Sequence, residues 1–460
     1  MSDNPTNERP VDERPADKRP ARITPRVPRG MRDILPEQMI KRQYVIDVIR
    51  GVFEEFGFEP LQTSAIELSE TLMGKYGPEA EKLIYQANHP GGKESLSLRY
   101  DLSVPLCRVV AMRPELVKPF KRYQIAPVWR GERPQRGRYR EFYQCDADTV
   151  GSASMLADAE TLNVIYEILT RLGFRRFVMN INDRKIITGI GLFSGVPEDR
   201  LAALYRAIDK LDKIGLDGVR EELRSHQIAD DVVERLLTLL QIEGENEAVL
   251  GALREELGAY PVAVEGIDEL GEVIRYLKAL AIPSSFYKVN FAMVRGLEYY
   301  TGPIFETTIE EPKMPSITGG GRYDELIGMF LNHSYPATGT TIGIERIFDA
   351  MEELAMFPAD VGRTTAQALV ARADASLVDE TLKLADALRK SGVKTELSFE
   401  GESLRAQIQR ARKKGIPYVA ILGPDEVATN SVTIRDMRQG QQETLKIEDA
   451  AAYIKNGLAR

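Results

Sequence analysis

Residues 123–144, YQIAPVWRGERPQRGRYREFYQ, carry the pattern that decides the fold. Residues 120–129 and 140–145 are rich in aromatic and branched apolar side chains, and the segment between them is polar and rich in arginine. This pattern predicts two antiparallel strands joined by a loop. Because side chains alternate along a strand, Arg130 and Glu132 are predicted to share a face of the first strand, and Arg140, Phe142 and Gln144 a face of the second.

The residue types on these faces allow two interpretations. Arginine binds phosphate through paired hydrogen bonds and an aromatic ring can stack on a base, so the hairpin would suit a nucleotide. A hairpin whose solvated face carries charge pairs would have the same composition. Periodicity alone does not decide between them.

Strand and helix patterns continue on both sides of the hairpin. Helical spacing of apolar residues from Ile40 to Phe53 predicts an amphipathic helix, and segments rich in Leu, Glu, Arg and Lys predict helices between about 185 and 280. The simplest account is one antiparallel sheet interrupted by a helical insertion, an α+β fold. The other predicted elements are strands at 95–98, 176–181, 287–289, 304–308 and near 317, helices at 153–172, 199–214 and 231–240, and a helix after Gly343.

The two ends of the chain have a different character. After about Gly362, strands at 367–370, 394–398 and 418–422 alternate with helices at 375–390 and 403–414, which predicts a small α/β domain with a largely parallel sheet. Residues 1–28 repeat proline after arginine and mix acids with bases, so we expect a disordered spacer and no targeting peptide.

Composition restricts the class of protein. With 28% charged and 43% hydrophobic residues among 460, and no run near the roughly 20 apolar residues of a membrane helix, we expect a soluble chain without a membrane partner. The two distant cysteines and three scattered histidines argue against a disulfide framework and a protein-bound metal. A net charge of −8 argues only weakly against nucleic acid, because RNA binding needs just a local basic surface. Helix 403–414, which carries Arg405 and Arg410, is such a surface, although a solvated basic helix would look the same.

Three more clusters are ambiguous when taken singly. They are VRGLEYYTG at 294–302, GGGRYD at 319–324 and GTTIGIER at 339–346. The glycine run at 319–321 could let backbone approach a ligand, but alone it slightly favours a tight bend. In the third cluster, glycines lead into a helix whose first turns could present Arg346 to phosphate, or could serve packing only.

Together the clusters resemble one family. Residues 99–105 with the hairpin resemble the second signature motif of class II aminoacyl-tRNA synthetases, 339–346 the third, and 57–64 the first. Residues 295–300 and 319–324 resemble the two signatures that distinguish histidyl-tRNA synthetases. The resemblance runs from about Arg29 to the C-terminus and implies a catalytic domain at 29–355, with its insertion at about 185–280, and an anticodon-binding domain at 362–460.

The resemblance implies that histidine is activated with ATP to histidyl-adenylate and transferred to the 3′ end of the histidine tRNA. The substrate carboxylate is itself the nucleophile, so catalysis consists of positioning and charge neutralisation. Magnesium would accompany the outer phosphates of ATP, with no structural metal in the protein. The family also implies a homodimer, built by the first motif, and a cytoplasmic location.

The same resemblance assigns residues. For ATP, Arg130 would hold the α-phosphate, Glu132 the adenine amino group and Arg346 the γ-phosphate, while Phe142 would stack on adenine. Arg295 would bridge the histidine carboxylate and the α-phosphate, which makes it and Arg130 the expected catalytic residues. For histidine, the ammonium group would contact Asp101, Ser103 and Gln144, and the imidazole Asp148 and Tyr300. The expected histidine-binding set also includes Arg130, Arg295 and Tyr299. For tRNA, the acceptor end would approach Arg133 and Gln135, and the anticodon Arg405 and Arg410.

Two other assignments are weighed against the ligase. Some synthetase-like paralogues act as the regulatory subunit of ATP phosphoribosyltransferase, but they lack the anticodon-binding domain and lose the 295–300 signature that this chain retains. A class II synthetase for threonine or proline would not explain the histidine-type signatures.

Overall fold

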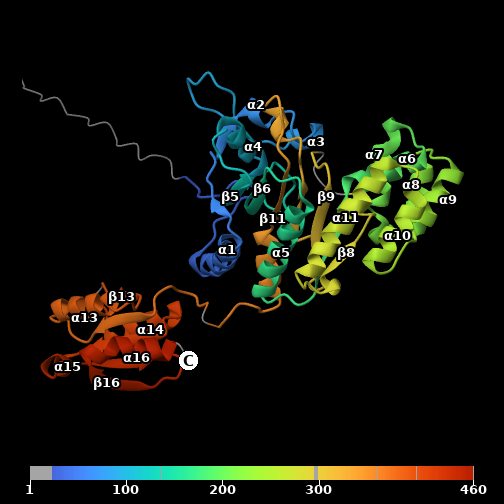
Figure 1. Ribbon diagram of the computed structural model, residues 1–460. Helices are drawn as coiled ribbons and strands as arrows, with labels where there is room; N and C mark the ends of the chain where they lie inside the picture. Colours follow the sequence, from blue (N-terminus) through green and yellow to red (C-terminus); the bar gives the residue numbers. More distant parts are fainter. Residues whose placement is uncertain (1–22, 136, 295–298, 360, 400, 459–460) are drawn as a thin grey trace, which may run out of the picture.

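The catalytic sheet is long, mixed at its edges and antiparallel at its centre. The computed structural model describes residues 23–135, 137–294, 299–359, 361–399 and 401–458. Within these residues, eight strands form one sheet in the order β1-β5-β6-β11-β10-β9-β7-β8 (Figure 1). Their bounds are β1 Glu59–Pro60, β5 Phe120–Trp129, β6 Glu141–Val150, β7 Phe177–Asp183, β8 Tyr287–Val289, β9 Pro303–Ile309, β10 Thr318–Arg322 and β11 Ala337–Ile342.

The predicted hairpin forms the longest strand pair of this sheet. β5 and β6 pair antiparallel over ten residues, from Phe120 opposite Val150 to Trp129 opposite Glu141. β6 runs five residues beyond the predicted end at Cys145, which extends its alternating faces to Asp146 and Asp148. The α+β fold class is confirmed, since only the edge pairs β1–β5 and β7–β8 are parallel.

The glycine run at 319–321 is a strand and not a bend, so the slight preference for a bend was wrong. β10 lies between β9 and β11. A Cβ on Gly320 would stand 2.2 Å from the Gly339 carbonyl oxygen and 2.6 Å from the Phe305 ring. Only glycine therefore lets the neighbouring backbone and ring approach this strand so closely.

Three helices pack against the sheet and bury the main apolar core. α1 (Pro36–Glu55) contacts α5 (Met155–Arg171) and α12 (Ile344–Glu353), and α5 contacts β11. The Ser154 hydroxyl caps α5 by accepting a hydrogen bond from the Leu156 amide. α1 therefore joins the N-terminal part of the chain to the helix that begins directly after β11.

The insertion between β7 and β8 is helical. α11 packs against α6 and α5, and so attaches the insertion to the catalytic sheet. The single helix predicted at 199–214 is wrong, because the chain turns between α7 and α8 and breaks again at Gly215, whose φ is 66°. The helices are α6 Arg184–Ser194, α7 Glu198–Ile208, α8 Leu211–Ser225, α9 Asp230–Leu240, α10 Asn246–Leu257 and α11 Pro261–Ala279, followed by the 3₁₀ turn Ser284–Phe286.

A second, smaller group of strands and helices packs beside the hairpin. Three short strands form a second antiparallel sheet in the order β2-β4-β3, next to short helices. The elements are β2 Ile66–Leu68, β3 Gln86–Ala87, β4 Leu96–Leu98, α2 Ser69–Leu72, α3 Pro78–Glu81, α4 Ser103–Met112 and the 3₁₀ turn Ile327–Met329.

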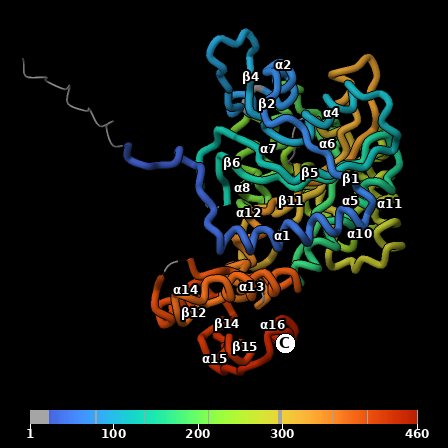
Figure 2. Tube along the Cα trace, turned by 90° about the vertical axis from the view of Figure 1, so that its left-hand side faces the viewer, coloured from blue at the N-terminus to red at the C-terminus, as the bar shows by residue number. Residues whose placement is uncertain are grey.

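The C-terminal part has a sheet of its own, apart from the catalytic sheet in both views (Figures 1 and 2). The three predicted strands are parallel, in the order β13-β12-β14 from one edge, but two unpredicted strands, β15 and β16, add antiparallel pairs. Half of the pairings are therefore antiparallel, and the sheet is less parallel than predicted. The bounds are β12 Ala368–Arg372, α13 Val378–Lys390, β13 Thr395–Leu397, α14 Leu404–Lys414, β14 Tyr418–Leu422, α15 Pro424–Ala428, β15 Ser431–Asp436, β16 Gln442–Lys446, the 3₁₀ turn Ile447–Asp449 and α16 Ala450–Leu458.

Two expectations concern the ends of the chain and its relation to membranes. Residues 1–22 lie outside the described residues, and Ile23–Pro28 are exposed without helix or strand, so the disordered spacer stays a prediction. In the described part of the chain, no helix has the length and apolar character that a bilayer span needs.

Candidate active site

A cavity of about 790 Å³ lies over the centre of the catalytic sheet. Its floor is formed by four neighbouring strands, β6, β11, β10 and β9. This volume is within the range typical of small-molecule sites. The predicted residues that line it are Asp101, Ser103, Arg130, Glu132, Gln135, Phe142, Gln144, Asp148, Tyr299, Tyr300 and Arg346.

One end of the cavity holds buried carboxylates. Asp148 lies on β6, where Arg122 Nη2 is 2.8 Å from its Oδ2 and the Tyr323 hydroxyl donates a hydrogen bond to its Oδ1. Asp101 comes just before α4, and its Oδ1 accepts from the Tyr76 hydroxyl at 2.9 Å and the Val104 amide at 3.0 Å. Both side chains are thus oriented by partners from other elements.

Asp146 is a third carboxylate of this wall, and the sequence analysis missed it. It lies two residues from Asp148 and from Gln144 on β6, so all three side chains share one face and line the cavity. Had the alternation noted for Phe142 and Gln144 been continued past Cys145, it would have identified Asp146.

Burial changes the protonation of these groups. Loss of water raises the pKa of Asp146 to about 7, against the attraction of the Arg122 guanidinium. Burial also raises the pKa of Asp101 and of Asp148, and the same cause raises the pKa of the Tyr323 hydroxyl well above its ordinary value. The phenol is therefore neutral at physiological pH and can donate to Asp148.

Glycine makes room for this wall. Gly339 on β11 pairs opposite Asp148, and a Cβ on Gly339 would stand 2.1 Å from Asp148 Oδ1. Gly319 is different, because it lines the cavity and a Cβ there would meet nothing within 4 Å. Gly339 therefore leaves space for the Asp148 carboxylate, and Gly319 keeps part of the cavity floor free of a side chain.

The other end of the cavity holds arginines. Arg130 lies with its guanidinium carbon 4.4 Å from the centre of the Tyr100 ring and 5.2 Å from that of Phe142, and its Nε donates to the Tyr100 carbonyl at 3.1 Å. β5 ends at Trp129, so Arg130 and Glu132 lie beyond the strand whose face they were predicted to share, although both reach the cavity. Glu132 pairs with Arg138, a cavity residue that the sequence analysis did not select.

Arg346 lies in the first turn of α12. Its Nη1 donates to the carbonyl of Ser316, two residues before β10 begins. A Cβ on Gly137, in the hairpin loop, would be 3.4 Å from Arg346 Cγ, so loop and helix are in contact here. Along β6, the six steps from Phe142 to Asp148 span roughly 20 Å, which separates the arginine end from the carboxylate end.

The segment before β9 contributes two tyrosines. Tyr299 and Tyr300 line the cavity with their ring centres 4.9 Å apart, and burial raises the pKa of both hydroxyls. Arg295, like Glu298, lies outside the described residues, so its place relative to the cavity stays a prediction.

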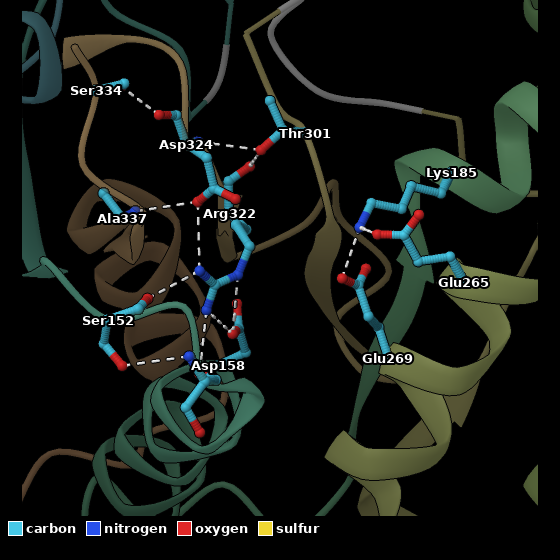
Figure 3. Close-up of polar contacts among 11 residues, drawn as sticks. Ser152, Asp158, Lys185, Glu265, Glu269, Thr301, Arg322, Asp324, Ser334 and Ala337 are labelled. Carbon is cyan, nitrogen blue, oxygen red and sulfur yellow. Dashed lines mark hydrogen bonds and ion pairs between the residues drawn. The ribbon is translucent and has the colours of Figure 1, made fainter. Parts of the chain in front are cut away.

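A buried arginine ties together the elements that carry these tyrosines (Figure 3). Arg322, 2% exposed, donates to Asp158 of α5, to the carbonyls of Ser152 and Ser154 and to Asp324. Its own carbonyl accepts from the Thr301 amide at 2.8 Å. The adjacent Tyr323 is the partner of Asp148, so this junction holds Asp148 close to the segment that carries Tyr299 and Tyr300.

Figure 3 also draws a second charged cluster, on the insertion side. Lys185 of α6 donates to Glu265 and Glu269 of α11, at 2.6 Å each. These contacts hold the first and last helices of the insertion together, and none of the three residues lines the cavity.

The residues predicted to contact tRNA lie on two separate surfaces. Gln135 is exposed at the edge of the cavity, and Arg133 is exposed beside it without lining it. In the C-terminal domain, Arg405 is exposed on α14, whereas Arg410 pairs with Glu402 at 2.7 Å and donates to Ser398.

The partners of the carboxylates were missed for a common reason. Tyr76, Arg122 and Tyr323 are distant in sequence from the side chains they contact, and no local pattern indicates these pairings. In the portion of the chain that is described, no three His, Cys, Asp or Glu side chains form a group that could hold a metal ion.

An antiparallel sheet with arginines and buried carboxylates around one cavity, followed by a small α/β domain, is the architecture of a class II aminoacyl-tRNA synthetase. Family models match residues 30–347 to histidyl-tRNA synthetase and residues 367–457 to an anticodon binding domain. The chain belongs to the histidyl-tRNA synthetase family.

Individual relatives agree. A histidine–tRNA ligase of Gloeobacter violaceus is 40% identical over 93% of this chain and 98% of its own, and one of Aeropyrum pernix is 40% identical over 94% and 98%. The crystal structure of histidyl-tRNA synthetase from Nostoc sp. superposes with a TM-score of 0.84 at 32% identity, covering 95% of this chain and all of that one.

These matches decide between the expected functions. The protein is an aminoacyl-tRNA synthetase that uses ATP to ligate histidine to tRNA. A structure described as an ATP phosphoribosyltransferase regulatory subunit/histidyl-tRNA synthetase, from Bacillus halodurans, shares the fold at 21% identity and a TM-score of 0.72. The matches over nearly the full length are to ligases, which favours the ligase over the regulatory subunit.

Proposed function

We propose that histidine binds at the carboxylate end of the cavity and ATP at the arginine end, with the reacting atoms between them. In this arrangement Asp101, Ser103 and Gln144 hold the ammonium group, and Asp148 with Tyr299 and Tyr300 receives the imidazole. The observation that carries the proposal is that buried aspartates, Asp101, Asp146 and Asp148, and the arginines Arg130 and Arg346 line one cavity.

The chemistry of the carboxylate end supports a cationic, hydrogen-bonding substrate. A buried carboxylate favours a donor and disfavours an apolar side chain, because an apolar ligand would leave it without a ligand partner. Asp146 adds a second carboxylate beside Asp148, and Arg122 compensates for only one charge.

At the arginine end, Arg130 would contact the α-phosphate and Arg346 the γ-phosphate, with Phe142 under the adenine and Glu132 at its amino group. Arg295 would bridge the histidine carboxylate and the α-phosphate. The carboxylate of histidine attacks phosphorus, pyrophosphate leaves, and fixed positive charge stabilises the transition state. No side chain has to remove a proton, since the nucleophile is already ionised.

Magnesium would be held by the outer phosphates and by water. The described residues offer no cluster of carboxylates for it, and Mg²⁺ at nucleotide sites commonly takes most of its ligands from phosphate and water. Bound there, it would neutralise charge on the leaving pyrophosphate. We propose no structural metal in the protein.

The division of labour between the domains belongs to the same proposal. Residues 29–355, with the insertion at about 185–280, would form the adenylate, and residues 362–460 would bind the anticodon through a surface that includes Arg405 and Arg410. Arg133 and Gln135 would approach the acceptor end of the tRNA. The enzyme would act as a cytoplasmic homodimer.

The test is exchange of labelled pyrophosphate into ATP with each of the twenty amino acids. Histidine alone should support exchange, and Arg295→Ala should reduce the rate at least ~100-fold because a fixed charge is lost from the reacting centre. Truncation after Gly362 should spare exchange and abolish charging of tRNA. Exchange with threonine or proline, a near-normal Arg295→Ala rate, or equal loss of both activities on truncation would each contradict one part of the proposal.

A further inference from the structure

Glu345 is a cavity residue to which the sequence analysis gave no role. It directly precedes Arg346 in the first turn of α12 and is almost fully buried. We propose that Glu345, held by Arg42, is a positioning residue that orients Arg346 toward the triphosphate of ATP. This inference rests on the role proposed above for Arg346.

Arg42 comes from α1, 303 residues away in sequence, and is only 2% exposed. Its Nη1 donates to Glu345 Oε2 at 2.7 Å and its Nη2 to Oε1 at 2.8 Å. This two-pronged pair fixes both position and rotation of the carboxylate, which a lysine could not do. The Tyr143 amide lies 3.4 Å from Oε1, so the pair is also joined to β6.

A second arginine reaches Glu345 from the N-terminal segment. Arg32 pairs with Glu345 Oε2, and its guanidinium carbon lies 3.6 Å from the centre of the Tyr139 ring, which lines the cavity. The Gly30 carbonyl accepts from the Arg140 amide at 2.9 Å, so residues 30–32 lie against the hairpin loop. Glu345 therefore links three separate parts of the chain at the arginine end of the cavity.

The consequence concerns the direction of Arg346. Residues 345 and 346 are adjacent in the same turn, so fixing one side chain to α1 fixes the rotation of the helix start that carries the other. A misdirected guanidinium would weaken contact with the outer phosphates and leave the histidine end unchanged.

The key variant is Glu345→Gln, which keeps the shape and removes the charge that both arginines share. We expect KM for ATP, and KM for pyrophosphate in the reverse reaction, to rise about 10-fold because a small displacement of a phosphate-binding group is costly. KM for histidine should stay unchanged. Arg42→Lys should fall between wild type and Arg42→Met, since it restores charge without the two-pronged geometry.

Lys41→Met is the matched control. Lys41 pairs with Glu352 and so also joins α1 to α12, but Glu352 lies near the other end of α12, roughly 10 Å from Glu345 along the helix axis. This variant should leave both KM values unchanged. Because Arg42→Met removes the two-pronged partner of a buried carboxylate and so threatens folding, Arg32→Met, at a half-buried site, provides a second test and should raise KM for ATP about threefold.

The outcomes separate this inference from the function on which it rests. A rise in KM for ATP and pyrophosphate alone, with thermal melting near that of Lys41→Met, supports it. Equal rises in the KM values for ATP and histidine, or no change in Glu345→Gln and Arg32→Met while Arg346→Ala raises KM for ATP, overturn the positioning role only. Unchanged KM for ATP in Arg346→Ala overturns the proposed role of Arg346 and the inference with it.

Discussion

The two ends of the cavity are built on different principles. At the carboxylate end, Asp101, Asp146 and Asp148 are buried, and tyrosine hydroxyls and Arg122 hold two of them through contacts within the protein. At the arginine end, Arg130 donates to a backbone carbonyl and Glu132 pairs with Arg138, a side chain that is 46% exposed.

In the proposed arrangement, the carboxylate end selects the amino acid and the arginine end binds ATP. A buried, prearranged carboxylate discriminates among amino acids, because a wrong side chain offers no donor to carboxylate oxygens that water no longer solvates. Arginines that contact carbonyls or exposed partners can exchange those partners for phosphate oxygens at small cost. We therefore expect changes at the two ends to separate in KM for histidine and KM for ATP.

The largest effect is expected for Arg130→Ala. Arg130 lies between the rings of Tyr100 and Phe142 and is proposed to contact the α-phosphate, where negative charge develops. Its loss should lower kcat of histidine-dependent pyrophosphate exchange about 100- to 1,000-fold. Arg171→Ala, which removes an exposed pair with Glu55 at 2.6 Å, is the control and should retain full activity. A rate near that of the control would remove Arg130 from the catalytic residues.

Asp148→Asn should have the next largest effect and the opposite pattern. The amide keeps the shape but removes the charge that pairs with Arg122 at 2.8 Å and the acceptor proposed for imidazole. KM for histidine should rise about 100-fold, consistent with leaving a buried charged group unpaired, while KM for ATP stays within about twofold. Glu160→Gln, at a half-buried pair with Lys121, controls for loss of a carboxylate elsewhere in the domain. A parallel rise in both KM values would mean that the two ends are not independent.

A smaller effect, on stability, is expected from the pKa of Asp146. Burial raises this pKa to about 7 in the folded protein, whereas an exposed aspartate titrates near 3.9. Between about pH 4 and 7 the folded state thus binds more protons than the unfolded state, so the contribution of Asp146 to the free energy of unfolding is full at low pH and is lost as pH rises through 7.

The measurement is urea unfolding of wild type and Asp146→Asn at pH 5 and pH 7.5, followed by fluorescence of Trp129, the single tryptophan. The stability of wild type relative to the variant should be lower at pH 7.5. A difference that is constant or larger at pH 7.5 would show that Asp146 is already ionised in the folded protein.

Much of the fold follows from side-chain alternation, and its exceptions have physical causes. β5 was predicted at its observed bounds, 120–129, because ten consecutive residues carry the pattern. A strand was predicted near 317, but its extension through the glycine run as β10 was not, since glycines have no side chains to form a pattern and the strand pairs with β9 and β11 on either side. The break between α7 and α8 lies within a continuous helical pattern and depends on tertiary packing.

The candidate site also consists of residues that were predicted from the sequence and contacts that were not. Local motifs identified eleven residues that line the cavity, because each motif keeps its chemistry within a few positions. The pairs that orient them join distant segments, such as Arg42 with Glu345, 303 residues apart, and Tyr323 with Asp148, 175 apart. No pattern within a segment specifies such pairs, because they depend on strand register and helix packing.

The smallest predicted effect concerns the pair of Glu132 with Arg138 at the arginine end. Glu132 is proposed to accept the adenine amino group, yet in this structure it is paired with Arg138 in the exposed hairpin loop. A solvent-exposed pair of this kind is worth at most about 1 kcal/mol, so Arg138→Met should lower KM for ATP by no more than about fivefold, by releasing Glu132. The effect should fade at high salt, which screens the pair in wild type as well. An increase in KM for ATP would instead mean that Arg138 itself contacts the nucleotide, and the arginine end would then be as fixed by its own residues as the carboxylate end.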